Sequence, residues 1–111
     1  MIIPVQDFNI MMFSCYDALP AHKGRKKEKK KYLDCICAFD IETSTDKALN
    51  INYMYIWQFQ IDDMYTIIGR RWSEFTDMIK QISEYLDDLH LVVYVHNLSY
   101  EFQYLKGIFD I

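Results

Sequence analysis

Apolar residues change their spacing along this chain, and the changes predict strands first and helices later. Residues 35–41 form a short, nearly continuous apolar run, which is typical of a buried strand. Residues 51–61 and 64–69 are rich in Tyr, Ile, Trp and Phe, which favours two further strands. Asp62-Asp63 between them predicts a tight hairpin turn, and the polar residues 43–46 predict another turn.

Helical spacing follows these strands. Ser73 is the expected N-cap of an amphipathic helix of about four turns. Its expected inward positions are Phe75, Met78, Ile79, Ile82 and Leu86. Residues 91–95 predict a second buried strand, and His96-Asn97-Leu98-Ser99 precedes an expected final helix. That helix would turn Phe102, Leu105, Ile108 and Phe109 inward. Near the N-terminus, residues 8–13 suggest a short strand.

This order of elements predicts an α/β fold. A strand, a hairpin, a helix and another strand follow one another, and a helical crossover normally leaves the later strand parallel to a neighbour. The 111 residues suffice for one domain, and the apolar fraction of 51% excludes a disordered chain. Cys35 and Cys37 alternate within the first apolar strand, so both are expected to be buried small hydrophobic residues.

Cysteine content and charge indicate the cellular compartment and a possible binding segment. Three cysteines do not make a disulfide framework, so a reducing, cytoplasmic setting is expected. Neither a membrane span nor a signal peptide is indicated. The net charge is −4, yet residues 23–31 contain seven basic side chains and one acidic side chain. This basic run is either a solvated linker or an arm that contacts phosphate.

Asp40-Ile41-Glu42 is the most informative tripeptide. Residues i and i+2 of a strand point to the same face, so both carboxylates project together from the end of an apolar strand. Two acids there call for water or a cation as a neighbour. Oxygen ligands of this kind suit Mg²⁺ or Mn²⁺, although a solvated acidic strand end explains the same pattern.

A second polar cluster lies where the strand 91–95 leads into the final expected helix. In an open α/β sheet, ligands bind at that end of a strand. Asn97 is placed to cap the helix or to bind a ligand, and Tyr100 to stack on a base. Glu101 lies in the first helical turn, where it stabilises the helix dipole or supplies another carboxylate.

Together, these two clusters resemble the 3′–5′ exonuclease domain of family B DNA polymerases, especially the protein-primed polymerases of phages and mobile elements. The likeness covers residues 32–111 and implies a partial ribonuclease H-like fold, with residues 1–31 as an N-terminal extension. It implies two Mg²⁺ or Mn²⁺ ions. The implied catalytic and metal-binding carboxylates are Asp40, Glu42 and Glu101, and the implied contacts to a single-stranded 3′ end are Asn97, Tyr100 and Thr43.

The resemblance also implies a larger protein, which synthesises DNA on a template and proofreads it in the cytoplasm of a bacterial host. Its implied partners are DNA, downstream polymerase domains and a terminal-protein primer, but no membrane. Two departures stand out. Glu101 replaces the usual Asp of the second motif, and the third motif, Tyr-x-x-x-Asp, does not occur. The chain is therefore expected to be an N-terminal piece or a truncated relative that is inactive by itself.

Three other functions share these features. A truncated domain of this fold would bind single-stranded nucleic acid without turnover. Another ribonuclease H-like nuclease would use the same acids on a different substrate. An interaction protein would carry the acids only as surface charge.

Overall fold

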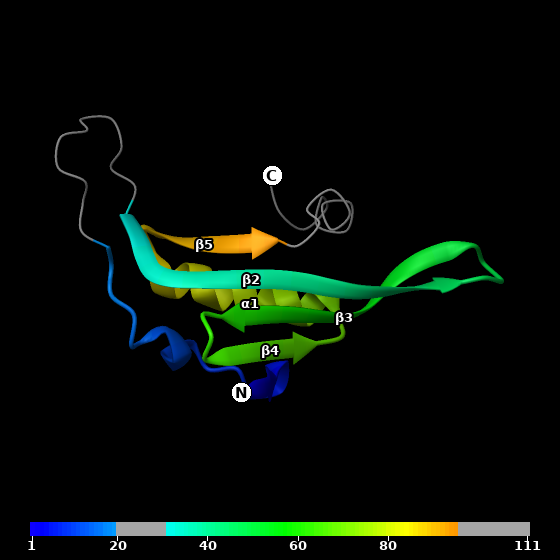
Figure 1. Ribbon diagram of the computed structural model, residues 1–111, viewed down its shortest axis with the longest axis horizontal. Coiled ribbons are helices and arrows are strands. Elements are labelled where there is room, and N and C mark those ends of the chain that lie inside the picture. The colour runs from blue at the N-terminus through cyan, green and yellow to red at the C-terminus, as the bar shows by residue number, and fades with distance from the viewer. Residues whose placement is uncertain (20–30, 96–111) are drawn as a thin grey trace, which may run out of the picture.

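The structure is a computed structural model that describes residues 1–19 and 31–95. Its centre is a five-stranded mixed sheet in the order β1-β4-β3-β2-β5, with helix α1 on one face (Figure 1). The strands are β1 (Ile2–Pro4), β2 (Lys31–Asp46), β3 (Ile51–Ile61), β4 (Tyr65–Gly69) and β5 (Leu89–Val95). The helices are α1 (Trp72–Leu86) and two short 3₁₀ helices, η1 (Val5–Asp7) and η2 (Ile10–Phe13).

The connectivity confirms the expected α/β fold. Strands β2, β3 and β4 form an antiparallel meander, and β5 returns after α1 to lie parallel to β2. The expected hairpin turn at Asp62-Asp63 is also confirmed, and Asp62 has a φ of 49°. Aspartate tolerates this left-handed conformation because its short side chain can bond to the local backbone.

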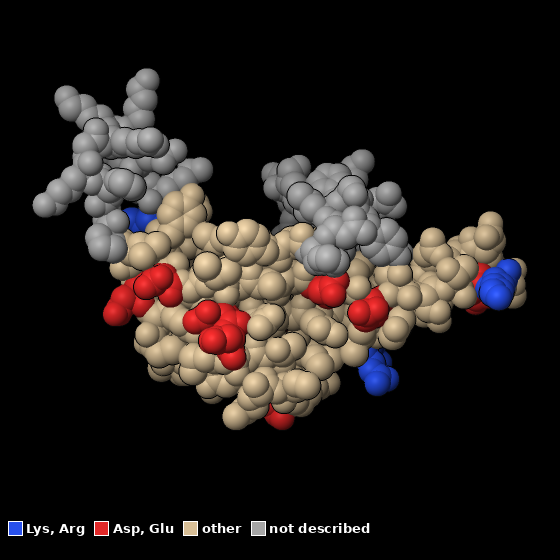
Figure 2. Space-filling view, in the orientation of Figure 1, with Lys and Arg blue, Asp and Glu red and all other residues tan. Residues whose placement is uncertain are grey.

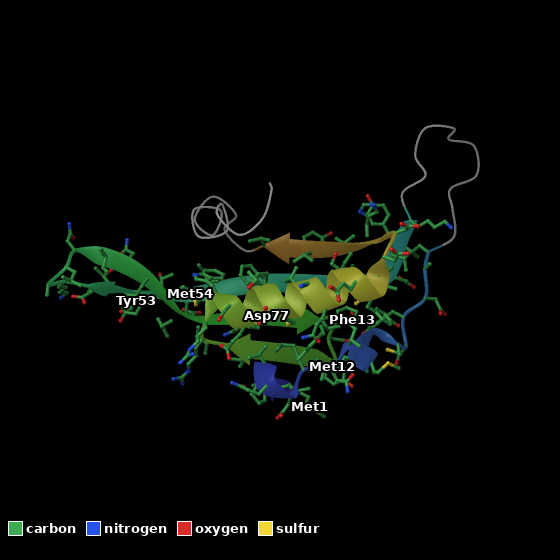
Figure 3. The ribbon with its side chains drawn as sticks, turned by 180° about the vertical axis from the view of Figure 1, so that it is seen from behind. Met1, Met12, Phe13, Tyr53, Met54 and Asp77 are labelled. Atoms are coloured by element: carbon green, nitrogen blue, oxygen red, sulfur yellow. The ribbon has the colours of Figure 1, made fainter. Side chains whose placement is uncertain are left out.

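The hydrophobic core lies between the sheet and α1, and Figure 3 shows α1 lying across this face of the sheet. Phe75 of α1 stands at its centre, with ring centroids 4.6 Å from Phe39 and 5.1 Å from Trp57. Aromatic pairs at these separations add to the stabilisation from burial itself. The predicted burial of Cys35 and Cys37 is confirmed. Alternate residues of β2 and β3 therefore face the helix, and the residues between them face away.

The start of α1 differs from the prediction. Ser73 lies inside the helix, and Arg71 is the N-cap. The physical reason is Glu74, whose Oε1 accepts the backbone N–H groups of Arg70 at 3.2 Å and Arg71 at 3.0 Å. A carboxylate in the first turn thus binds the backbone that leads into the helix, one residue earlier than the serine would place the start. The predicted inward positions are confirmed, since Phe75, Met78, Ile82 and Leu86 are buried and Ile79 packs against the core.

The N-terminal segment also corrects a prediction. Residues 8–13 were expected to form a strand, but Ile10–Phe13 forms the 3₁₀ helix η2. The side chain of Asn9 accepts the backbone N–H of Met11 at 2.9 Å, which favours a turn over an extended chain. Phe13 is fully buried in the core as a result. The strand of this region is Ile2–Pro4, which pairs parallel with β4.

The turn predicted over residues 43–46 is wrong, because β2 continues through Asp46. Its last four residues pair with β3, after a register shift between Glu42 and Thr43. The turn itself comes at residues 47–50, where Asp46 Oδ1 accepts the backbone N–H of Ala48 at 3.0 Å. The result is a hairpin arm that projects beyond the rest of the sheet (Figure 1).

Strand β5 matches the predicted strand at residues 91–95, but it is less buried than expected. It pairs only with β2 among the described strands, and 63% of the Tyr94 surface is exposed. The predicted helix after residue 96 and most of the basic run 23–31 lie outside the described residues. No helix in the described part of the chain is long and apolar enough to span a membrane.

Candidate metal and nucleic-acid site

The two carboxylates of the Asp-x-Glu motif belong to the face of the sheet opposite α1. Strand alternation places Asp40 and Glu42 on this open face, while Phe39 and Ile41 between them are buried in the core. Asp40 is half-buried, and its Oδ1 accepts the backbone N–H of Ile41 at 2.9 Å. Glu42 is exposed. The burial pattern of β2 therefore agrees with the prediction, from the i, i+2 spacing, that the two carboxylates share one face of the strand.

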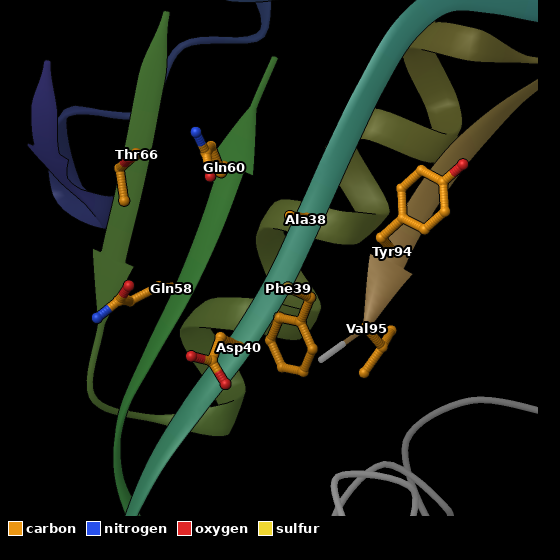
Figure 4. A pocket seen from close by; sticks show the side chains of 8 residues that line it. All are labelled: Ala38, Phe39, Asp40, Gln58, Gln60, Thr66, Tyr94 and Val95. Atoms are coloured by element: carbon orange, nitrogen blue, oxygen red, sulfur yellow. The ribbon is translucent and has the colours of Figure 1, made fainter. Parts of the chain in front are cut away.

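An open groove of about 440 Å³ surrounds Asp40 on this face (Figure 4). Its polar lining comes mostly from neighbouring strands. Gln58 of β3 pairs directly with Asp40, while Gln60 pairs with Ala38 and with Thr66 of β4. These amide and hydroxyl groups both donate and accept hydrogen bonds. The groove thus offers oxygen ligands for a hard cation and hydrogen-bond partners for a polar ligand.

Sequence reasoning missed Gln58, Gln60 and Thr66. A signal was present, because the two glutamines alternate with three apolar residues, Trp57, Phe59 and Ile61. Such alternation marks a strand with one buried and one open face. Only the strand register shows that this polar row adjoins Asp40.

The second motif begins beside the first. Val95, the last described residue of β5, pairs with Phe39, the residue immediately before Asp40. Neighbouring strands lie about 4.8 Å apart, so Val95 lies close to the Asp-x-Glu pair. Asn97, Tyr100 and Glu101 lie outside the described residues, as does His96. Their approach to Asp40 and Glu42 stays a prediction.

Thr43 occupies a different position from the two acids. It follows Glu42, is half-buried, and pairs with Met54, which packs against the core. Strand alternation directs its side chain toward the α1 side of the sheet. The expected contact of Thr43 with a DNA end stays a prediction.

The described residues supply only part of a metal-binding set. Within residues 1–19 and 31–95, no three His, Cys, Asp or Glu side chains gather closely enough to hold a metal ion. Asp40 and Glu42 nevertheless fit a hard cation, because a magnesium ion usually takes one or two protein carboxylates and completes its shell with water and phosphate. Acidic side chains are also more frequent than basic ones on the open face in Figure 2.

The cysteines do not contribute a nucleophile to this site. Cys35 and Cys37 lie on the core side of β2, with their Sγ atoms 4.0 Å apart. Burial raises the pKa of both thiols, so both stay protonated near neutral pH. The groove around Asp40 is lined by carboxylate, amide and hydroxyl groups.

Comparisons of this chain with protein-family models, with curated proteins and with solved structures each found no match. The evidence on function is therefore the pair of motifs and the geometry around Asp40.

Proposed function

We propose that this chain is the N-terminal part of a 3′–5′ exonuclease domain of the family B DNA polymerase type, with a ribonuclease H-like fold. Asp40 and Glu42 hold two Mg²⁺ or Mn²⁺ ions together with Glu101. Asn97, Tyr100 and Thr43 contact the single-stranded 3′ end of DNA. In the full-length polymerase, this domain removes nucleotides after misincorporation, and the downstream domains synthesise DNA from a terminal-protein primer.

One observation carries the proposal. Asp40 and Glu42 share the open face of β2, and Val95, just before His96 and Asn97 of the second motif, pairs with the residue that precedes Asp40. The meander, the helix and the parallel return strand also agree with the connectivity that the resemblance implies.

Each side chain has a defined task in this proposal. Bound divalent ions supply charge stabilisation and an activated water for phosphodiester hydrolysis. Asp40 and Glu42 provide the carboxylate oxygens that hold the ions. Gln58, directly opposite Asp40, donates a hydrogen bond from its amide to a carboxylate or phosphate oxygen. Phe39 and Ile41, buried on the other side, hold the strand in place.

A cation titration tests the metal site directly. Mn²⁺ is added to isotopically labelled protein, and paramagnetic broadening of backbone NMR signals is recorded. The signals of residues 38–42 and 94–95 are expected to broaden first, and Asp40→Asn or Glu42→Gln to suppress the effect. The matched control is Asp34→Asn, an exposed acid on the same strand. It lies about 20 Å from Asp40 along an extended strand.

Equal broadening around Asp34 and Asp40 would mean that the acids are only surface charge, and the proposal would fail. A labelled single-stranded oligonucleotide incubated with Mn²⁺ separates the remaining functions. Little or no cleavage is expected from this chain, because the third motif does not occur in it. Rapid cleavage that Asp40→Asn abolishes would identify a complete nuclease instead.

A further inference from the structure

We infer that Arg70 and Arg71 form a phosphate-binding turn that holds the DNA strand whose 3′ end reaches Asp40 and Glu42. This inference rests on the proposed function, because it assigns a further contact to the DNA strand that the proposed function brings to Asp40 and Glu42. The two arginines follow β4 directly and precede α1. Both are exposed, and neither forms an ion pair with a carboxylate in the part of the chain that the structure describes.

The turn is fixed from beneath by a buried tryptophan. Trp57 is fully buried, and its indole Nε1 donates a hydrogen bond to the backbone oxygen of Arg71 at 2.9 Å. Gly69 lets the indole approach the backbone, because a Cβ atom there would overlap the ring and lie 2.7 Å from Nε1. A buried polar atom that fixes a surface turn reduces the entropy lost when that turn binds a ligand.

A second anchor acts from the helix. The carboxylate of Glu74 accepts the backbone N–H groups of both arginines, and its other oxygen accepts a hydrogen bond from the Gln6 side chain at 3.3 Å. These backbone donors are therefore already occupied. An anion at this turn would therefore meet the two guanidinium groups and not the backbone N–H groups of Arg70 and Arg71. Guanidinium groups suit phosphate because they donate parallel hydrogen bonds to two oxygens.

The turn lies at the same end of the sheet as the two acids. Ile41 pairs with Trp57, and Trp57 pairs with Gly69, so Arg70 begins one residue beyond the row that holds Ile41. Two strand spacings separate these positions, which is about 10 Å. The span between the acids and the arginines therefore corresponds to a few nucleotides of a single strand.

Neighbouring residues line a groove at each of the two positions. Arg70 and Arg71 line an open groove of about 630 Å³, together with Ile68. Ile68 pairs with Gln58, which lines the groove around Asp40. Asp40, Gln58 and Ile68 thus form one row across three strands, with one groove at Gln58 and the other at Ile68. A DNA strand on this path would place one phosphate at the acids and their cations and further phosphates at the arginines.

Binding of a fluorescent oligothymidylate, followed by anisotropy in Mg²⁺ at several salt concentrations, tests this path. Arg70→Ala and Arg71→Ala are each expected to weaken binding about tenfold. This is the lower end of the effect expected when a hydrogen bond to a charged group is lost. Each is also expected to lower the slope of log affinity against log salt by about 0.7, the value for one phosphate contact on a single strand. The control is Lys80→Ala, which removes an equal charge from an exposed position of α1.

Arg70→Lys adds a stricter test. It keeps the charge, so the salt slope should stay at its original value while the affinity falls through loss of the forked contact. Wild-type affinity in both alanine variants, or no binding by the unmodified protein, would overturn the inference. The Mn²⁺ response at Asp40 is measured separately. If the arginine variants lose binding while that response is absent, the phosphate-binding turn stands and the proposed metal site fails.

Discussion

Replacing Gly69 by alanine probes the contact that joins the core to the arginine turn. The added methyl group would overlap the indole of Trp57, whose Nε1 would lie 2.7 Å away. The ring has little freedom to move, because it is fully buried, packs edge-on against Phe75 at 5.1 Å and is hydrogen-bonded to Arg71. Overpacking of this kind costs about 1–3 kcal/mol of unfolding free energy.

The expected change is large enough to measure by thermal unfolding. Each kcal/mol lowers the melting temperature of a domain of this size by about 4–8 °C. The control is the same substitution in a Trp57→Phe background. Phenylalanine has one ring in place of two and lacks Cζ2, the indole atom nearest to the added methyl group, so the Gly69→Ala penalty should shrink there. The difference between the two penalties is the coupling free energy of the pair, measured by urea titration.

Two outcomes would refute this reasoning. If the Gly69→Ala variant has the same melting temperature as the unmodified protein, the indole and the backbone of Gly69 do not approach each other closely. If the penalty is the same in the unmodified protein and in the Trp57→Phe background, its cause is the backbone of β4 and not the indole. In either case the proposed support of the arginine turn would lose its basis.

Three further predictions concern the core. Phe75→Ala should destabilise the fold by about 3–5 kcal/mol in urea titrations, because it empties the centre of an aromatic cluster. A thiol reagent at neutral pH should modify exposed Cys15 quickly and reach the buried Cys35 and Cys37 only after unfolding. Stability should fall as the pH rises above about 9, because burial raises the pKa of these two thiols and of Tyr16, and the unfolded chain then loses protons that the folded chain keeps. Urea midpoints at increasing pH would measure this loss, and a flat profile would contradict it.

Much of the central fold could be predicted from local patterns. The alternation around Asp40 separated a core face from an open face, and the spacing of apolar residues after Arg71 predicted α1. The hairpin turn was predictable because Asp62 suits a left-handed backbone. Each of these features depends on residues that are near one another in the chain, and such local features are the easiest to predict from the sequence.

The errors arise where distant residues decide the structure. Residues 43–46 favour a turn locally, yet pairing with residues 51–54 extends β2 into the hairpin arm. Ile2–Pro4 becomes a strand because β4, more than sixty positions away in the chain, offers it an edge. Pairing partners of this kind outweigh weak local preferences, since β propensity depends strongly on context.

The candidate site shows the same division. The Asp-x-Glu pair was visible in the sequence, but the groups beside it come from the register of three strands.

Asp40, Gln58 and Ile68 share one row on the open face, and Ile41, Trp57 and Gly69 share the next row on the core side. The two rows are successive residues of the same strands, so whatever fixes the core row also positions the open one. The hydrogen bond from Trp57 to Arg71 connects the core row to the arginine turn at the surface. A change that leaves Asp40 intact but shifts the register of β3 would therefore separate the acids from the arginines, and oligothymidylate binding by the proposed path should be lost.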